Sequence, residues 1–223
     1  GGADLMEGWV GDDTYYVDHP GDLVIDFIGN DHVMASIDWT LSSGLDDLTL
    51  LDDAITAIGN DASNELVGTS GDNILDGRGG VDILTGGSGS DVFVLRSPGN
   101  GTRADVITDF NSADGDRIAL PAYMFGANQL PDVSNIKSFT ELLSSLKTDT
   151  DLVYNSRNGY LYYNANGSGH GMGTGGGLLG IVSNKPESID AFVALPDPFQ
   201  EHLTPESLSP LLTVSPLPLP SDM

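Results

Sequence analysis

The feature that most constrains this chain is a nine-residue period in its glycine and Asp or Asn residues. Four glycines open successive nonapeptides over residues 59–94: Gly59, Gly68, Gly77 and Gly86. The sixth position of each nonapeptide is Asn or Asp (Asn64, Asn73, Asp82, Asp91), and the eighth is large and apolar (Leu66, Leu75, Leu84, Phe93). Units this short cannot bury a core alone and must stack on their neighbours. The period therefore predicts a solenoid in which two nonapeptides make one coil.

A weaker copy of the same period occupies the N-terminal stretch. Asp4, Asp13, Asp22 and Asp31 are nine residues apart, and each is followed two positions later by an apolar or aromatic residue. The step from Asp31 to Asp46 breaks the phase, because it equals one period of nine and a further six positions. We interpret this break as an insertion near residues 35–45 and expect residues 1–110 to form one repeat domain.

Composition excludes several classes of partner and site. Acidic residues outnumber basic residues 33 to 8, so the net charge is −25 and unaided binding to nucleic acid or to anionic lipid is excluded. The absence of cysteine excludes disulfides and thiolate metal sites, and no apolar run is long enough for a membrane span. The chain starts at Gly1 with neither a Met nor a signal peptide, which indicates either a fragment of a longer polypeptide with an upstream domain or a processed product.

The residue types of the repeat suit calcium. Parallel strands stack about 4.8 Å apart, so residues one coil apart face each other across one layer of the solenoid. Calcium takes six to eight oxygen ligands at about 2.3–2.6 Å, more than one turn can supply but within the reach of two stacked turns. Glycine lets backbone carbonyls approach an ion, and 27 of the 33 acidic residues are Asp, the shorter carboxylate. The pattern therefore predicts ions held between stacked turns.

The motif G-G-x-G-x-D-x-U-x, seen at Gly86-Gly-Ser-Gly-Ser-Asp-Val-Phe-Val94, resembles that of RTX (hemolysin-type) calcium-binding repeat proteins. Residues 104–120 and 160–195 are similar to the serralysin-like C-terminal domain that follows such repeats. The resemblance implies an all-β fold: a parallel β-roll, also called an RTX β-helix, followed by a small β-rich cap with one short helix.

The resemblance also implies a ligand set of carbonyls at positions one and three and the side chain at position six. It predicts one site from Gly68, Ser70 and Asn73 with Gly86, Ser88 and Asp91, and a second from Gly59, Asp61 and Asn64 with Gly77, Gly79 and Asp82. Further pairings are Asp109 facing Asp91, Asp4 facing Asp22, and Gly8, Val10 and Asp13 facing Asp31, with Asp46 as a weaker candidate. Four to six Ca²⁺ ions are expected, bound less tightly where Asn replaces Asp.

The remaining sequence predicts a cap over residues 111–195. A capping box at Ser138 predicts a helix over residues 138–147, and Asn158-Gly159 predicts a hairpin between strands at 152–154 and 160–162. Further strands are expected at 178–182 and 189–195. The proline-rich tail, residues 196–223, is expected to be extended and to serve as part of a secretion signal, a linker or a strap along the roll.

Neither His-Glu-x-x-His nor Gly-x-Ser-x-Gly occurs, so we expect a non-catalytic module. The resemblance implies a secreted bacterial protein whose roll folds on calcium after export by the type I secretion machinery, and an extracellular or cell-surface location. One alternative is a repeat segment of a surface-layer protein or adhesin. Another is a polysaccharide-contacting module of a secreted hydrolase or epimerase. The sequence upstream of Gly1 would separate these hypotheses.

Overall fold

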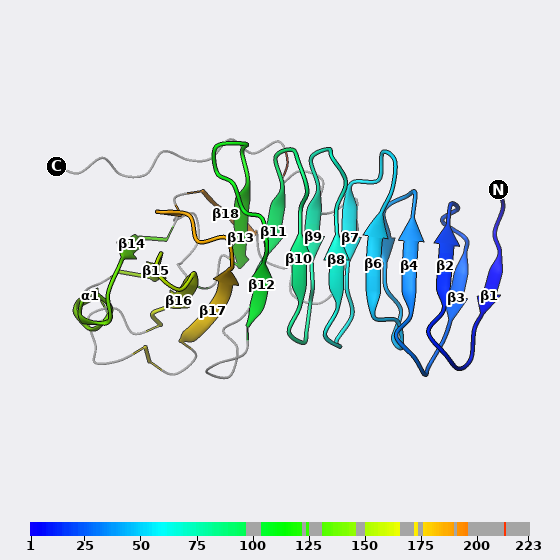
Figure 1. Cartoon of the computed structure of the whole chain (residues 1–223), viewed down its shortest axis with the longest axis horizontal. Coiled ribbons are helices and arrows are strands. Elements are labelled where there is room, and N and C mark those ends of the chain that lie inside the picture. The colour runs from blue at the N-terminus through cyan, green and yellow to red at the C-terminus, as the bar shows by residue number, and fades with distance from the viewer. Residues whose placement is uncertain are drawn as a thin grey trace.

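The protein is a long stack of short strands that ends in a smaller mixed cap (Figure 1). The computed structural model describes residues 1–96, 104–121, 124, 131–145, 150–165, 172–173, 176–189, 191–195 and 212. The N-terminal strands form one end of the stack, and the cap with the helix forms the other. The predicted all-β class and parallel roll are confirmed.

Two rows of parallel strands face each other across the roll. One row contains β2 (Thr14–Val17), β4 (His32–Ala35), β6 (Asp47–Leu50), β8 (Glu65–Val67), β10 (Ile83–Thr85) and β12 (Asp105–Ile107). The other contains β5 (Trp39–Thr40), β7 (Thr56–Ile58), β9 (Ile74–Asp76), β11 (Val92–Val94), β13 (Arg117–Pro121) and β18 (Phe192–Leu195), and β1 (Leu5–Glu7) pairs with β3 (Leu23–Ile25) in a separate sheet. Successive strands of the regular roll alternate between the rows, so each layer holds two nonapeptides.

The strand register confirms the coil of two nonapeptides and corrects the expected insertion. Leu66 pairs with Leu84 and Leu75 with Phe93, each pair exactly two periods apart. At the phase break, Val33 pairs directly with Leu48, three residues short of a full coil. Residues 35–45 therefore belong to a coil that is three residues shorter than its neighbours, and nothing is inserted there. The shortening lies between β4 and β5, which are joined by residues 36–38.

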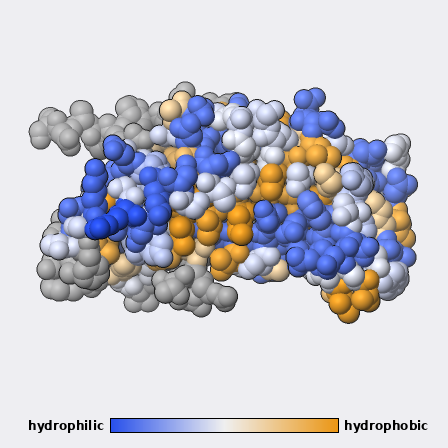
Figure 2. Space-filling view, in the orientation of Figure 1, coloured by the Kyte–Doolittle hydropathy of each residue, from blue (hydrophilic) through white to orange (hydrophobic). Residues whose placement is uncertain are grey.

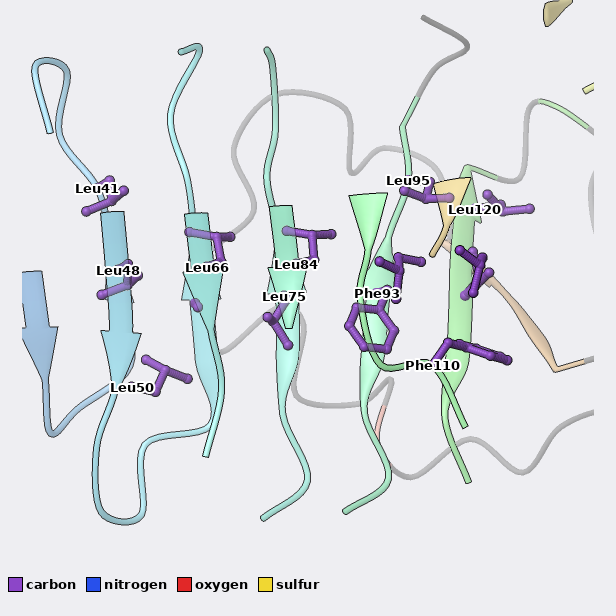
Figure 3. Close-up of a cluster of buried hydrophobic side chains, with 14 of the residues drawn as sticks. Leu41, Leu48, Leu50, Leu66, Leu75, Leu84, Phe93, Leu95, Phe110 and Leu120 are labelled. Atoms are coloured by element: carbon purple, nitrogen blue, oxygen red, sulfur yellow. The ribbon is translucent and has the colours of Figure 1, made fainter. Parts of the chain in front are cut away.

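The core consists of apolar side chains that both rows of strands send inward, layer after layer, along the axis of the roll. Figure 3 shows Leu48, Leu66, Leu84 and Phe93 following one another from layer to layer. Side chains alternate between the two faces of a strand, so each three-residue strand sends its middle residue inward. Leu66 of β8 is fully buried while its neighbour Glu65 is exposed. The apolar eighth position of the repeat is thus the inward position.

The cap continues both rows of the roll. β17 (Gly177–Val182) pairs in parallel with β12, and so continues one row, while β18 pairs in parallel with β13 and continues the other. β17 also pairs antiparallel with β16 (Tyr160–Tyr163), which forms a hairpin with β15 (Leu152–Asn155). β14 (Val133–Ile136) pairs in parallel with β15 at the edge of this sheet. The predicted hairpin is confirmed, but its loop spans residues 156–159, with Gly159 at a φ of 80°. No helix among the described residues has the length and apolar character needed to cross a bilayer.

The predicted helix is α1 (Phe139–Ser145), and residues 146–149 lie outside the described part. Ser138 Oγ accepts a hydrogen bond from the Glu141 amide at 3.2 Å, and Glu141 Oε2 accepts one from the Lys137 amide at 2.6 Å. The first bond is the one that the capping box predicts, whereas the second reaches the amide of Lys137 instead of the amide of the N-cap residue Ser138. The proline-rich tail lies outside the described residues except Leu212, which packs on the outer apolar face of the β7–β9–β11–β13 row.

Candidate calcium sites

The sixth-position residues form two columns, one along each edge of the roll. In the first column each residue stands at the start of a strand of the β2–β12 row: Asp13, Asp31, Asp46, Asn64, Asp82 and Asp105. In the second column they precede β1, β3 and strands of the other row: Asp4, Asp22, Asn73, Asp91 and Asp116. The alternation of strands between rows places successive nonapeptides in different columns.

Within each column, hydrogen bonds from the backbone amide of one layer to the carboxylate of the next join several of the layers. The backbone amide of Asn64 donates to Asp82 Oδ1 at 2.8 Å, and the amide of Asp82 donates to Asp105 Oδ1 at 3.0 Å. The second column repeats the arrangement, since the Asp91 amide donates to Asp116 Oδ1 at 2.9 Å. The carboxylates of Asp31, Asp82 and Asp91 are each fixed in this way by one oxygen to the layer before, which leaves the second oxygen available.

That second oxygen is buried and unpaired at three positions. Among the described residues, Asp31 Oδ2, Asp82 Oδ2 and Asp91 Oδ2 are buried carboxylate oxygens without a hydrogen-bond partner. A buried polar oxygen without a partner is destabilising by about 1–3 kcal/mol, and more when charged. Such an atom requires an explanation, and a bound cation supplies one. Carboxylate oxygens are also the ligands that calcium prefers.

The electrostatics of these residues support the same conclusion. Burial raises the pKa of Asp91 to about 7, and the nearby carboxylates of Asp116 and Asp109 act in the same direction. Burial also raises the pKa of Asp82 and of its neighbour Asp105 well above the usual range. Burial and repulsion penalise the ionised form, so ionisation of these groups near neutral pH needs a compensating positive charge.

The glycines of the repeat leave room where the ligands converge. A methyl group added at Gly86 would overlap Asp91 Oδ2, and one added at Gly77 would overlap Asp82 Oδ2. A methyl group at Gly68 would lie against both the Gly86 carbonyl oxygen and Asn73 Oδ1. Position one is glycine here because carbonyl and carboxylate oxygens of two layers occupy the space of a side chain.

For each of the two predicted main sites, the structure brings some of the predicted residues close together. Gly68, Asn73, Gly86 and Asp91 converge at one edge, and Gly59, Asn64, Gly77 and Asp82 converge at the other. Gly79 lies against Asp61, since a methyl group on it would be 3.3 Å from Asp61 Cα. Ser70 is exposed and Ser88 lies in an equivalent exposed turn. The role of these two serines as carbonyl ligands stays a prediction.

The two asparagines behave differently from the aspartates. Asn73 Nδ2 donates to the carbonyls of Ala54 at 3.1 Å and Ile55 at 3.4 Å in the preceding layer. Asn64 Nδ2 donates to the Asp46 carbonyl at 2.9 Å. In both cases the side-chain amide bonds to carbonyls of the preceding layer, a contact that an aspartate carboxylate could not make. The two middle layers of the roll are therefore joined by protein hydrogen bonds.

Two column members were missed by sequence reasoning, and one residue was assigned to the wrong position. The predicted pairing of Asp109 with Asp91 is wrong, because Asp116 occupies that place and Asp109 instead accepts hydrogen bonds from the Gly86 and Gly87 amides at 3.0 and 2.8 Å. Asp105 likewise extends the first column beyond Asp82. The last coil is longer than the regular coils, so extrapolating the period selected Asp109. The run of aspartates over residues 105–116 was the available signal.

At the N-terminal end the Asp4 and Asp22 pair is already satisfied. Asp22 accepts hydrogen bonds from the backbone amides of Asp4, Asp18 and His19 at 2.9, 3.2 and 3.1 Å. The Asp4 amide bond comes first among the causes that lower the pKa of Asp22. Backbone amides of neighbouring residues therefore already satisfy both oxygens of this carboxylate, which stabilises the turn without an ion.

The Asp13 and Asp31 pairing is confirmed as a contact, because the Asp13 amide donates to Asp31 Oδ1 at 3.0 Å. Gly8 lies beside Asp13, and the Val10 amide donates to the Gly8 carbonyl at 3.0 Å. The Val10 side chain is 70% exposed, so only its backbone could face an ion.

Figure 2 shows hydrophobic side chains gathered at the N-terminal end of the roll, where the exposed large apolar residues of the two turns are Trp9, Val10, Phe27 and Ile28.

Comparison with known proteins agrees with this geometry. Residues 58–93 match the RTX calcium-binding nonapeptide repeat in four copies. A search of curated proteins finds no match. The matched residues include β8–β10 and both layers in which Asp82 and Asp91 carry an unpaired oxygen. Over this segment, the sequence of the roll is thus similar to that of RTX calcium-binding repeats.

Proposed function

Because residues 58–93 are RTX calcium-binding repeats, we propose that this chain is a non-catalytic module of a secreted bacterial protein that folds when it meets calcium. In this proposal the chain leaves the cell unfolded through the type I secretion machinery, together with an upstream domain. The roll then forms outside the cell, where calcium is plentiful. The observation that carries the proposal is the pair of unpaired, buried oxygens of Asp82 and Asp91 within the matched repeats.

The proposed dependence on calcium has a physical basis in the composition of the chain. A net charge of −25 on a thin core is self-repelling, and glycine-rich turns lose much conformational entropy on folding. Each ion that binds only the folded roll stabilises it by about 1.4 kcal/mol at ten times its dissociation constant. A few such sites match a large part of the stability of a small domain, about 5–15 kcal/mol.

The test is folding of the full chain with and without calcium. Far-UV circular dichroism in excess chelator should show loss of the β signal, and millimolar calcium should restore it. Magnesium at the same concentration should restore much less, because it demands six ligands at shorter distances and keeps its waters. A β spectrum that is the same in chelator and in calcium would refute calcium-triggered folding.

A further inference from the structure

The N-terminal turns at residues 8–13 and 26–31 bring three carboxylates together outside the segment that matches the repeat family. Asp13, Asp26 and Asp31 each present an oxygen, and these oxygens lie within 4.8 Å of one another. No other group of three or more potential metal-ligating residues is this close in the described part of the chain. The arrangement includes Asp26, which does not belong to either sixth-position column.

Asp26 stands at position one of its nonapeptide, where the regular repeats have glycine, as at Gly59 and Gly77. It is buried, at 1% exposure, and its carboxylate is held from two sides. The Tyr15 hydroxyl donates to Asp26 Oδ2, and the Phe27 amide donates to Oδ1 at 2.7 Å. A side-chain carboxylate therefore enters the space between two layers, in place of the backbone alone.

Gly8, one coil earlier, makes room for this carboxylate. A methyl group added there would overlap Tyr15 Oη and Asp26 Oδ2 and would lie 2.6 Å from Asp13 Oδ2. Three oxygens from three side chains thus converge above one glycine. Such a convergence of oxygens is what a hard cation requires.

Asp31 gives an independent sign that this cluster takes a ligand. Its side chain is fully buried, and Oδ1 is held by the Asp13 amide. Its Oδ2 has no hydrogen-bond partner, although the carboxylates of Asp13, Asp26 and Asp46 are close enough to repel its charge. In the part of the chain that the structure describes, the ion pairs join Gly1 to Asp18 and Arg96 to Asp76, so neither neutralises this cluster. A bound cation would neutralise this repulsion and give Asp31 Oδ2 a partner.

We propose that Asp13, Asp26 and Asp31 form a three-carboxylate site for a hard cation, calcium in the natural setting, with Tyr15 as the residue that positions Asp26. The site rests on the proposed function only for the identity of its ion. With three carboxylates where the middle layers have amides, it should bind more tightly than the sites at Asp82 and Asp91.

Terbium is a suitable probe, because Tb³⁺ takes the oxygen ligands of calcium and emits when a nearby aromatic ring absorbs light. Tyr15 is bonded to a proposed ligand, so tyrosine-excited emission should report this site. In the full chain, Asp26→Asn and Gly8→Ala should each raise the terbium concentration at the midpoint of the tyrosine-excited titration by about tenfold or more. Even the loss of a residue that only orients a metal ligand lowers affinity by about 10–100-fold. Gly8→Ala leaves the charge unchanged and tests the space alone.

Tyr15→Phe should remove most of the tyrosine-excited emission while calorimetry still counts the same number of bound ions. Asp18→Asn is the matched control, because it removes one charge from the same end of the roll at an exposed residue and should leave the titration unchanged. Circular dichroism in saturating calcium checks that each variant is folded. If Asp26→Asn unfolds, Tyr15→Phe carries the test.

The failures of the two proposals can be told apart. Terbium emission that Asp26→Asn, Gly8→Ala and Tyr15→Phe all leave unchanged overturns the three-carboxylate site and leaves the proposed function intact. Absence of any terbium or calcium binding by the whole chain overturns both.

Discussion

The backbone amide of Asn73 donates to Asp91 Oδ1 at 2.8 Å, and this bond leaves Asp91 Oδ2 buried without a partner. One carboxylate thus joins two layers by one oxygen and offers the other to an ion. Asp22 accepts its interlayer amide in the same way, but its remaining capacity is filled by the Asp18 and His19 amides. Residues at equivalent positions of the repeat therefore serve different purposes.

This contrast predicts different effects of two matched substitutions. Asp91→Asn should shift the calcium midpoint of folding upward by about tenfold or more, because a charged ligand is lost. Asp22→Asn should destabilise the N-terminal turn at every calcium concentration, with little change in the midpoint, because its partners are backbone amides. A calcium titration followed by circular dichroism, with urea unfolding at saturating calcium, measures both effects. A larger midpoint shift for Asp22→Asn would contradict the assignment.

The asparagines of the middle layers predict the reverse experiment. Asn73→Asp removes the amide donor to the Ala54 and Ile55 carbonyls and adds a charge beside Asp91. Without calcium the variant should be less stable by about 1–3 kcal/mol, the usual effect of leaving a buried acceptor unpaired. With saturating calcium it should recover, because a second carboxylate then faces the ion. Urea unfolding in the two conditions tests this, and an equal loss in both would show that Asn73 has no such role.

The raised pKa values predict an unusual dependence of stability on pH. The pKa of Asp91 is near 3.8 in the unfolded chain and about 7 in the folded one, so the folded state binds the proton more tightly over that interval. Without calcium, the free energy of unfolding should therefore increase as the pH falls from about 8 to about 5. With calcium the trend should reverse, because protons compete with the ion for the carboxylates. Urea midpoints in calcium-stripped and calcium-saturated buffers measure both slopes, and parallel slopes would be evidence against ion binding at these residues.

Position four of the repeat predicts unequal effects of one substitution. Gly89 has a φ of 113° and a methyl group there would lie 2.7 Å from the Gly71 carbonyl, so Gly89→Ala should be destabilising by about 1–3 kcal/mol. Gly71 is not among the glycines at positive φ, and its nearest neighbour would be Thr69 Oγ1 at 3.6 Å. Gly71→Ala should thus be close to neutral. Thermal unfolding in saturating calcium compares the pair, and equal losses would show that the motif, rather than the local backbone, requires glycine.

The regular part of this fold could be predicted because it rests on a period. Once Leu66, Leu75 and Leu84 are recognised as inward positions, the register of two nonapeptides per coil and the facing sixth positions follow from strand geometry. The site residues at Asp82 and Asp91 could be predicted for the same reason. The serralysin-like character of residues 104–195 and the domain boundary near residue 110 stay predictions.

The departures from the period could not be predicted because more than one register fits the same spacing. The step from Asp31 to Asp46 is read equally well as an insertion or as a shortened coil, and only the pairing of Val33 with Leu48 decides. Asp109 and Asp116 both follow the last regular repeat, and the length of the final coil selects Asp116.

Asp26 was missed for a different reason, because its position in the repeat is ordinarily glycine. Its contribution depends on the contact between its carboxylate and the Tyr15 hydroxyl. Tyr15 belongs to the preceding coil, and spacing alone does not reveal that its side chain reaches the next layer. A contact of this kind is visible only once the strands are stacked.

The amide-joined layers at Asn64 and Asn73 have a consequence for how the whole roll responds to its surroundings. In a solenoid each coil interacts only with its neighbours, so energy is passed along the stack one interface at a time. A stretch that is joined by amides separates the N-terminal carboxylates from those around Asp82 and Asp91. Occupancy at one end is therefore transmitted to the other only through interfaces that are already formed. The roll should therefore bind calcium in two blocks, one on each side of the interfaces that Asn64 and Asn73 make with their preceding layers, and a calcium titration of folding should resolve two steps.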